Sequence, residues 1–250
     1  MTSEVRSRFV DLGGERGHLL ESGAGVPVVI IASLLVRASS YLPLLRALSG
    51  NYHVMVLALP GAGHTREPSE PLSQERLIAL TAEFLQGVAE GPALVIGHSN
   101  SGAVAMGLAV HHPSLVRGLV LADSVGAREP VNFWGVLWGR LVDALLEPWL
   151  ALTRGWHLIA SALLHAPTFW KQVFFSCRVK LLALAAEVKV PTLIAWGRWD
   201  HTFPLHCAER LQRAIPHARV VTGPGSHDWL ITRPRAFAKA VREFDDSLPS

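Results

Sequence analysis

Three residues in separate parts of the chain have the types that serine nucleophile chemistry needs. A serine hydroxyl becomes an effective nucleophile when a histidine takes its proton and an acid orients that histidine. Ser99 lies in the stretch Gly-His-Ser-Asn-Ser-Gly at residues 97–102, and Asp200 and His227 follow it in that order. The order serine, acid, histidine accompanies a strand-to-helix nucleophile turn. The sequence therefore predicts Ser99 as the nucleophile, His227 as the base and Asp200 as the acid.

A short candidate strand comes before each of these residues, at 93–96, 191–196 and 218–222. The first two are nearly continuous apolar runs, which are typical of strands buried on both faces. A strand, a sharp turn and a helix from Asn100 form the context that a nucleophile turn requires, and a glycine- and serine-rich turn without catalysis is the alternative. Because parallel strands end at one edge of a sheet, we expect the three side chains to lie together.

Two further aspartates stand close to these positions. Asp123 directly follows another apolar run and is the alternative acid for His227, although the loop that carries Asp200 is favoured. Asp228 is the neighbour of His227 and cannot easily reach back to its ring, so we interpret it as the N-cap of the next helix.

The elements that must position these residues alternate between strand and helix patterns along most of the chain. This alternation predicts an α/β fold with a mostly parallel eight-stranded sheet flanked by helices. The first two strands are expected to form an antiparallel hairpin at its edge. The predicted strands are 9–12, 18–21, 27–31, 53–57, 93–96, 119–121, 191–196 and 218–222, and the predicted helices are 40–49, 73–90, 100–112, 205–215 and 229–244.

Residues 130–176 interrupt the alternation with a helical pattern that contains five of the eight tryptophans. Its first helix is amphipathic. We interpret the segment as a helical lid packed on the sheet, with its tryptophans and leucines around an apolar pocket; contact with a membrane surface or a second copy is the alternative. The apolar face carries Trp134, Leu137, Trp138, Leu141 and Leu145, and the polar face carries Arg140, Asp143 and Glu147. A later strip of His157, Ser161 and His165 is expected to face solvent, with an orientation into the pocket as the alternative.

Four motifs together resemble the α/β-hydrolase superfamily, in its serine hydrolase form, over nearly the whole chain. They are the serine turn at 97–102, Leu-Pro-Gly-Ala-Gly-His-Thr at 59–65, Gly-Arg-Trp-Asp at 197–200 and Gly-Ser-His at 225–227. The resemblance implies a hydrolase core at 1–129 and 177–250, with 130–176 as an inserted helical cap.

The resemblance also implies an oxyanion hole built from the backbone amides of Asn100 and Leu34. The family commonly has a His-Gly pair in the preceding loop, and this chain has Ala32 and Ser33 there. Ser33 either adds a hydroxyl donor or is an ordinary serine at a strand end, and the second interpretation is favoured.

The composition of the chain limits which classes of partner and cofactor are expected. The chain has 23 Lys and Arg against 20 Asp and Glu, a net charge of +3 that is too small for a nucleic-acid binder. No nucleotide motif or metal-ligand spacing is present, so we expect no cofactor and no metal. Cys177 and Cys207 are too few for a disulfide framework, and no export signal or membrane-spanning run is seen, so we expect a cytoplasmic protein.

These observations favour a serine hydrolase that cleaves a carboxylester or lactone of a hydrophobic small molecule through an acyl-enzyme at Ser99. Two alternatives stay open, because this scaffold supports many chemistries. The same three residues are compatible with C–C bond hydrolysis, lyase or acyl-transfer chemistry on a specialised metabolite. A ligand-binding protein without turnover is the other alternative, raised by the replacement at Ala32 and Ser33.

Overall fold

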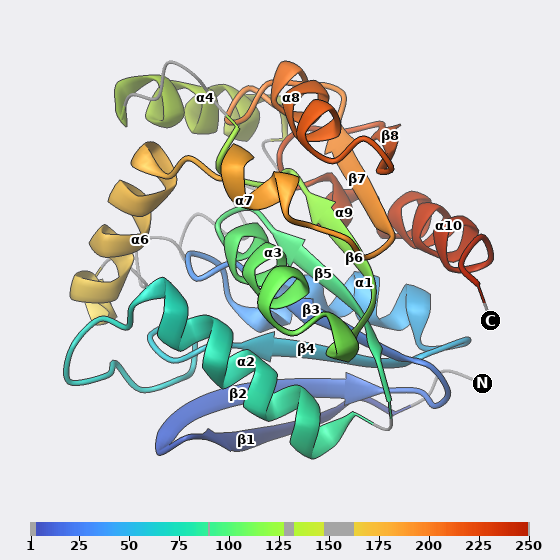
Figure 1. Ribbon diagram of the computed structural model, residues 1–250. Coiled ribbons are helices and arrows are strands. Elements are labelled where there is room, and N and C mark those ends of the chain that lie inside the picture. Colours follow the sequence, from blue (N-terminus) through green and yellow to red (C-terminus); the bar gives the residue numbers. More distant parts are fainter. Residues whose placement is uncertain (1–3, 90, 128–132, 148–162, 250) are drawn as a thin grey trace.

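The computed structural model describes residues 4–89, 91–127, 133–147 and 163–249 (Figure 1). One eight-stranded sheet has the order β1-β2-β4-β3-β5-β6-β7-β8, in which β1 pairs antiparallel with β2 and β2 antiparallel with β4, and all other pairs are parallel. The predicted α/β fold is thereby confirmed. The strands are β1 (Arg6–Leu12), β2 (Glu15–Ser22), β3 (Pro27–Ile31), β4 (His53–Ala58), β5 (Ala93–His98), β6 (Val116–Ala122), β7 (Thr192–Gly197) and β8 (Arg219–Gly223).

Helices cover both faces of the sheet, and each face has its own apolar core (Figure 1). The central strands β3, β5 and β7 are buried along their whole length, as expected for strands between two helical layers. One face is covered by α2 (Gln74–Val88), α3 (Ser101–His111), α7 (Leu182–Ala186) and α8 (His206–Ala214), and the other by α1 (Leu42–Leu48), α9 (Trp229–Thr232) and α10 (Pro234–Asp245).

Local chemistry explains where several helices begin and break. The side chain of Ser73 accepts a hydrogen bond from the Arg76 amide and caps α2. The single helix predicted at 229–244 is wrong, because the chain breaks between α9 and α10 at Pro234. Proline lacks the N–H that an unbroken helix needs, and it disfavours helical geometry at the preceding Arg233.

Cys177 and Cys207 are both buried thiols.

Two described helices, α4 (Phe133–Leu146) and α6 (Ala166–Arg178), come from the segment between β6 and β7 and lie over the C-terminal edge of the sheet (Figure 1). His165 stands just before α6, and its ring contacts Glu67 Oε2 at 3.1 Å and the Gly63 carbonyl oxygen at 3.2 Å. His165 is therefore buried and does not face solvent as expected. The other expectations for this segment, at Trp149, Trp156, His157 and Ser161, lie outside the described residues.

Helix α4 turns its tryptophans to the surface, opposite to the sequence expectation, although Leu137 of the same expected face lines an apolar cavity. Trp134, Trp138 and Leu145 on its apolar face are 74%, 67% and 71% exposed, whereas Asp143 on its polar face is 3% exposed. The expected packing of the tryptophan face on the core is therefore wrong for this helix.

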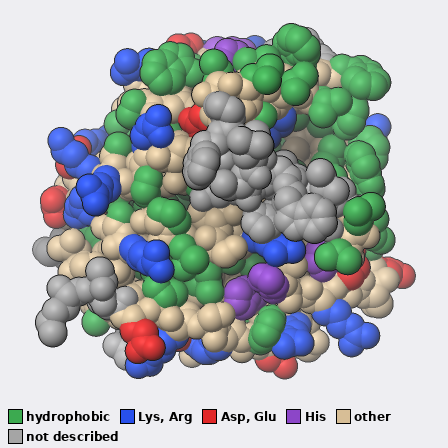
Figure 2. Space-filling model, turned by 180° about the vertical axis from the view of Figure 1, so that it is seen from behind, with side chains coloured by type: hydrophobic (Ala, Val, Ile, Leu, Met, Phe, Trp, Pro, Cys, Tyr) green, Lys and Arg blue, Asp and Glu red, His purple; other side chains and the backbone are tan. Residues whose placement is uncertain are grey.

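Seen from behind, apolar side chains gather along the edge of the molecule where α4 and α6 lie (Figure 2). None of the helices within the described ranges has the length and apolarity to cross a membrane.

Candidate active site

Ser99 sits on a tight turn directly between β5 and α3. Its φ of +55° lies in the left-handed region, which is uncommon for a residue with a side chain. The turn also needs small neighbours. A Cβ on Gly97 would lie 2.8 Å from the Gly102 Cα, and a Cβ on Gly102 would lie 2.0 Å from the Ser124 Oγ. Ser101 fits because its hydroxyl donates to the Ala32 carbonyl oxygen at 2.7 Å.

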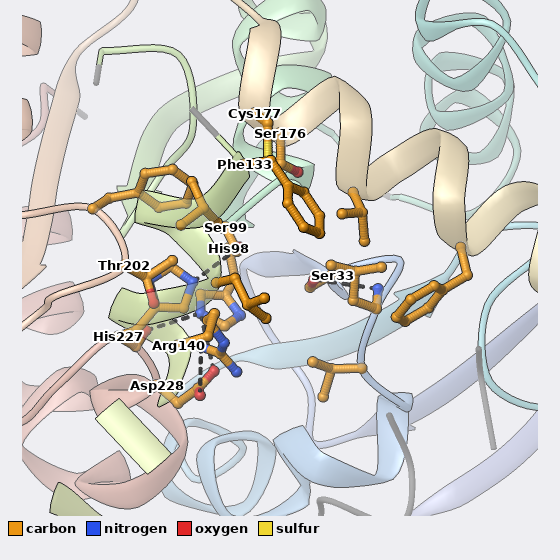
Figure 3. A pocket seen from close by; sticks show the side chains of 17 residues that line it. Ser33, His98, Ser99, Phe133, Arg140, Ser176, Cys177, Thr202, His227 and Asp228 are labelled. Atoms are coloured by element: carbon orange, nitrogen blue, oxygen red, sulfur yellow. Dashed lines mark hydrogen bonds and ion pairs between the residues drawn. The ribbon is translucent and has the colours of Figure 1, made fainter. Parts of the chain in front are cut away.

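The three predicted side chains meet at the C-terminal edge of the sheet. The Ser99 hydroxyl lies 3.0 Å from His227 Nε2, and His227 Nδ1 lies 2.9 Å from Asp200 Oδ2. Ser99 and His227 face one another in the pocket (Figure 3). Asp200 also accepts a hydrogen bond from the Phe203 amide through Oδ1, so both of its oxygens are held. The arrangement has the hydrogen bonds that a serine, a base and an orienting acid require.

Asp123, the alternative acid, is buried beside Asp200 and has a different contact. It follows β6 with a φ of +46°, and its Oδ1 accepts from the Gly197 amide at 2.7 Å. Burial and the nearby charge of Asp200 raise the pKa of Asp123 well above its ordinary value. Burial also raises the pKa of Asp200, but the charge and hydrogen bond of His227 oppose this. Asp123 is therefore the carboxyl of this pair that holds a proton most readily.

Asp228 is not a side-chain N-cap. Its carboxylate makes no capping bond to α9 and instead pairs with Arg140 of α4, with Nη1 and Oδ2 3.1 Å apart. Burial alone would raise the pKa of Asp228, but the charge of Arg140, together with His227 and His98, holds it well below its ordinary value. The expectation failed because a cationic partner from a distant helix outcompetes the local backbone N–H groups for this carboxylate.

Below the turn, a buried hydrogen-bond chain connects three loops. His98 Nε2 lies 3.2 Å from the His227 carbonyl oxygen and 3.7 Å from Asp228 Oδ1, and Nδ1 lies 2.7 Å from the Tyr41 hydroxyl. The Tyr41 hydroxyl also accepts from the Ser33 amide at 3.0 Å. Burial lowers the pKa of His98 to about 3, which keeps its ring neutral at ordinary pH.

The loop expected to supply the second oxyanion amide is tied to Asn100. Both the Ser33 hydroxyl and the Leu34 amide donate to Asn100 Oδ1, at 3.0 and 3.2 Å. The Ser33 side chain lines the pocket and contacts the serine turn, so it is more than a strand-end serine. The Leu34 amide, which the family resemblance assigns to the substrate oxyanion, is therefore already hydrogen-bonded to Asn100 Oδ1.

A cavity of about 200 Å³ opens onto Ser99 and His227 (Figure 3). That is smaller than the ~300–1,000 Å³ typical of sites for drug-sized ligands. Trp134 and Trp138, expected as lining, are not among the residues around it. Its wall is mostly apolar and includes Leu35, Val36, Phe133, Val136, Leu137, Phe169, Val173 and Phe203.

Sequence reasoning missed the contribution of Arg140, Tyr41 and Asp143 to this region. Each is buried or half-buried in contact with a loop that carries a predicted site residue. For Arg140 and Asp143 the available signal was the polar stripe on an otherwise apolar helix, and the sequence offers no comparable signal for Tyr41. Within the described residues, no group of three or more His, Cys, Asp or Glu side chains has an arrangement that could hold a metal ion.

Comparisons with known proteins agree with this architecture. A hydrolase of 2-hydroxy-6-oxo-6-(2'-aminophenyl)hexa-2,4-dienoic acid from Metapseudomonas resinovorans is 26% identical over 262 residues, covering 95% of this chain and 90% of the relative. Lipase 1 of Psychrobacter immobilis is 26% identical over 241 residues, covering 83% and 73%.

Among solved structures, a serine hydrolase involved in carbazole degradation superimposes with a TM-score of 0.78 at 23% identity, covering 97% of this chain and 99% of that chain. At this identity, the similarity shows the fold. A model of the family described as "Alpha/beta hydrolase family" matches residues 22–240. This match spans most of the sequence, and the chain therefore belongs to the alpha/beta hydrolase family.

Proposed function

We propose that this protein is a serine hydrolase that cleaves an ester of a hydrophobic small molecule through an acyl-enzyme at Ser99. The observation that carries the proposal is the hydrogen-bonded series Ser99, His227 and Asp200, with distances of 3.0 and 2.9 Å, in which Ser99 and His227 line an apolar cavity. Carboxylesters and lactones are the substrate class, because their reacting carbonyl is small and their remaining surface can be apolar.

In the proposed mechanism, Ser99 Oγ attacks the substrate carbonyl carbon while His227 Nε2 takes the hydroxyl proton. The ester C–O bond then breaks, and His227 returns the proton to the departing alcohol. Water repeats the sequence in the second half: it loses a proton to His227, attacks the acyl carbon and releases the acid and Ser99. Asp200 accepts the His227 Nδ1–H and stabilises the imidazolium that forms in each half.

The oxyanion hole is assigned to the backbone amides of Asn100 and Leu34. The position of Asn100 after the nucleophile, at the start of α3, supports its amide for this task, because helix N-termini favour negative charge. The Leu34 amide is paired with Asn100 Oδ1. Its use therefore requires the Asn100 side chain to turn away, or to share the donor, as the oxyanion forms.

Residues 130–176 act as a cap over the acyl site in this proposal. Phe133 and Leu137 of α4 and Phe169 of α6 line the cavity, which supports recognition of an apolar acyl group by this segment. The small cavity favours short and medium acyl chains.

A fluorophosphonate probe followed by peptide mapping tests nucleophile and activation together. We expect modification at Ser99, and a loss of ester turnover on the order of 10³ or more in Ser99→Ala. Ser101→Gly is the matched control on the same turn and should stay within about tenfold of the wild type, since glycine also fits a close turn. Modification of another serine, or an equal loss in Ser101→Gly, would contradict the proposal.

A second candidate reaction is C–C bond hydrolysis by the same residues. The relative from Metapseudomonas resinovorans favours it, because the keto acid in its name contains no ester bond. Turnover of p-nitrophenyl esters compared with turnover of a vinylogous 1,5-diketone acid separates the two candidates. A rate for the keto acid that exceeds every ester would place the C–C reaction first.

A further inference from the structure

The polar face of α4 contacts both loops that carry the predicted acid and base. Arg140 pairs with Asp228, as described above. Asp143 accepts from the amides of His201 and Thr202, both at 3.0 Å, and from the Thr202 hydroxyl at 2.6 Å. Arg140, Asp143 and Glu147 are thus spaced about one helical turn apart, and each makes an ionic or hydrogen-bonding contact to these loops. Glu147 lies directly after the helix.

These contacts flank the predicted acid and base in the sequence. Residues 201 and 202, which Asp143 holds, directly follow Asp200. Glu147 Oε1 accepts from the Ser226 amide at 3.3 Å, so the residues on either side of His227 are held by Glu147, directly after α4, and by Arg140 within it.

The helix also comes unusually close to the acid loop. A Cβ on Gly139 would lie 2.1 Å from the His201 carbonyl oxygen and 2.7 Å from the Thr202 Cα. Real Cβ atoms do not approach backbone atoms so closely, so only glycine allows α4 to bring Asp143 within hydrogen-bond distance of this turn.

We propose that α4 is the positioning element of the acid and the base, with Asp143 as the positioning residue that acts through Asp200. The inference rests on the proposed function and deepens it, because it couples the cap to the reaction. Lifting α4 from the core releases the Asp200 and His227 loops together. The cap therefore holds the site in its reactive geometry as well as covering it.

A double-mutant cycle tests the route through Asp200. The readout is the rate at which a fluorophosphonate modifies Ser99. Asp143→Asn is isosteric and replaces one accepting oxygen by an amide that cannot accept; we expect a rate about 10²-fold lower, the size of effect that a misplacement of about 1 Å produces. In an Asp200→Asn background the same substitution should change the rate by less than about threefold, because coupled residues are not additive. For an ester substrate, kcat should fall while KM stays within about twofold.

Gly139→Ala approaches the same contact from the helix backbone. Alanine is the better helix former by about 1 kcal/mol, so this substitution does not weaken α4 itself, but its methyl group must push α4 away from the acid loop. We expect the rate of Ser99 modification to fall by about tenfold or more relative to the wild type. Leu145→Ala, on the exposed face of the same helix, is the matched control and should leave the rate unchanged.

The outcomes separate this inference from the proposed function. No modification of Ser99 in the wild type would overturn the proposed function and this inference with it. Modification of the wild type, together with unchanged rates in Asp143→Asn and Gly139→Ala, would overturn the inference alone. An equal effect of Asp143→Asn in both backgrounds would also overturn it, because Asp143 would then act independently of Asp200. Should Asp143→Asn not fold, Gly139→Ala alone decides.

Discussion

Helices α3 and α4 are both rich in apolar residues, and they use them in opposite ways. Nine of the eleven residues of α3 are buried, and small residues let the helix pack closely, Ala105 against β5 and Gly107 against Ile78 of α2. In α4 the buried residues are Gly139 and Asp143, while Trp134 is exposed. An apolar stripe therefore identifies a face of a helix but does not decide which face turns inward.

The surface that each helix meets explains the difference. Helix α3 lies on the face of the sheet, where β5 and β6 present apolar side chains. Helix α4 lies at the C-terminal edge of the sheet, over loops whose backbone N–H groups point outward. Once the helix covers them, N–H groups such as those of Thr202 and Ser226 need acceptors from it or from the residue after it. A polar edge selects the polar face of the helix that covers it.

The largest expected effect separates the two carboxyls at this edge. Asp123 lies on the side of the serine turn and Asp200 lies in the loop held by α4. Asp200→Asn should lower kcat by about 10⁴, because His227 loses the acceptor for its Nδ1–H. Asp123→Asn should be mild, since Asp123 is the more readily protonated of the pair. Steady-state kinetics on one ester checks both, and a reversed order would assign the acid to the loop after β6.

One leucine in each helix has the opposite exposure. Leu108 of α3 is fully buried and Leu145 of α4 is 71% exposed. Leu108→Ala should lower the free energy of unfolding by about 2–5 kcal/mol through lost burial and a cavity, and Leu145→Ala should change it by less than about 0.5 kcal/mol. Urea titrations of both variants measure this. A large loss in Leu145→Ala would mean that the outer face of α4 is covered in solution.

The two regions also differ in how they bury ionisable groups. Arg140 keeps Asp228 charged beside α4, whereas His98 under the serine turn is kept neutral. Between pH 6.5 and about 3 the unfolded chain protonates this histidine and the folded chain does not, so acidification destabilises the fold. By pH 4.5 the loss from His98 should be about 3 kcal/mol.

Unfolding free energies at pH 7 and pH 4.5 test this, with His98→Gln as the comparison. The variant should lose less stability between the two pH values than the wild type, because its side chain does not titrate. Equal losses would show that other groups, rather than His98, govern acid sensitivity.

The smallest effect concerns which side chains of α4 contact the acyl group. Each substrate methylene buried in the cavity should contribute roughly 0.8 kcal/mol, about fourfold in kcat/KM, until the cavity is full. Phe133→Ala should flatten this dependence, and Trp138→Ala should preserve it, since only Phe133 of the two lines the cavity. A p-nitrophenyl ester series from acetate to decanoate measures the slopes. A flat series in the wild type would contradict an apolar acyl site.

The fold and the meeting of Ser99, Asp200 and His227 were accessible from the sequence for a physical reason. Strands buried on both faces leave uninterrupted apolar runs, and the ends of parallel strands lie at one edge, so residues that directly follow such runs come together. The close turn at Ser99 restricts its neighbours to small residues, which leaves a readable local pattern.

The inward polar face of α4 was not accessible in this way. Periodicity shows that Arg140 and Asp143 share a side of a helix, but their partners, Asp228 and Thr202, lie more than fifty residues away in the chain. Asp228 was misassigned for the same reason, because a local pattern suggests a cap while a distant cation decides. Contacts between separate loops depend on the assembled fold rather than on neighbouring residues.

The chain of hydrogen bonds through Tyr41 and His98 has only one possible direction. The His227 carbonyl oxygen can only accept, so His98 Nε2 carries the proton and its Nδ1 accepts from the Tyr41 hydroxyl, whose oxygen in turn receives the Ser33 amide. His98 is thus fixed as a single tautomer with an imidazole proton shut away from water. In an NMR spectrum that proton should exchange slowly with solvent and serve as a built-in reporter of whether the serine turn and the histidine loop remain joined.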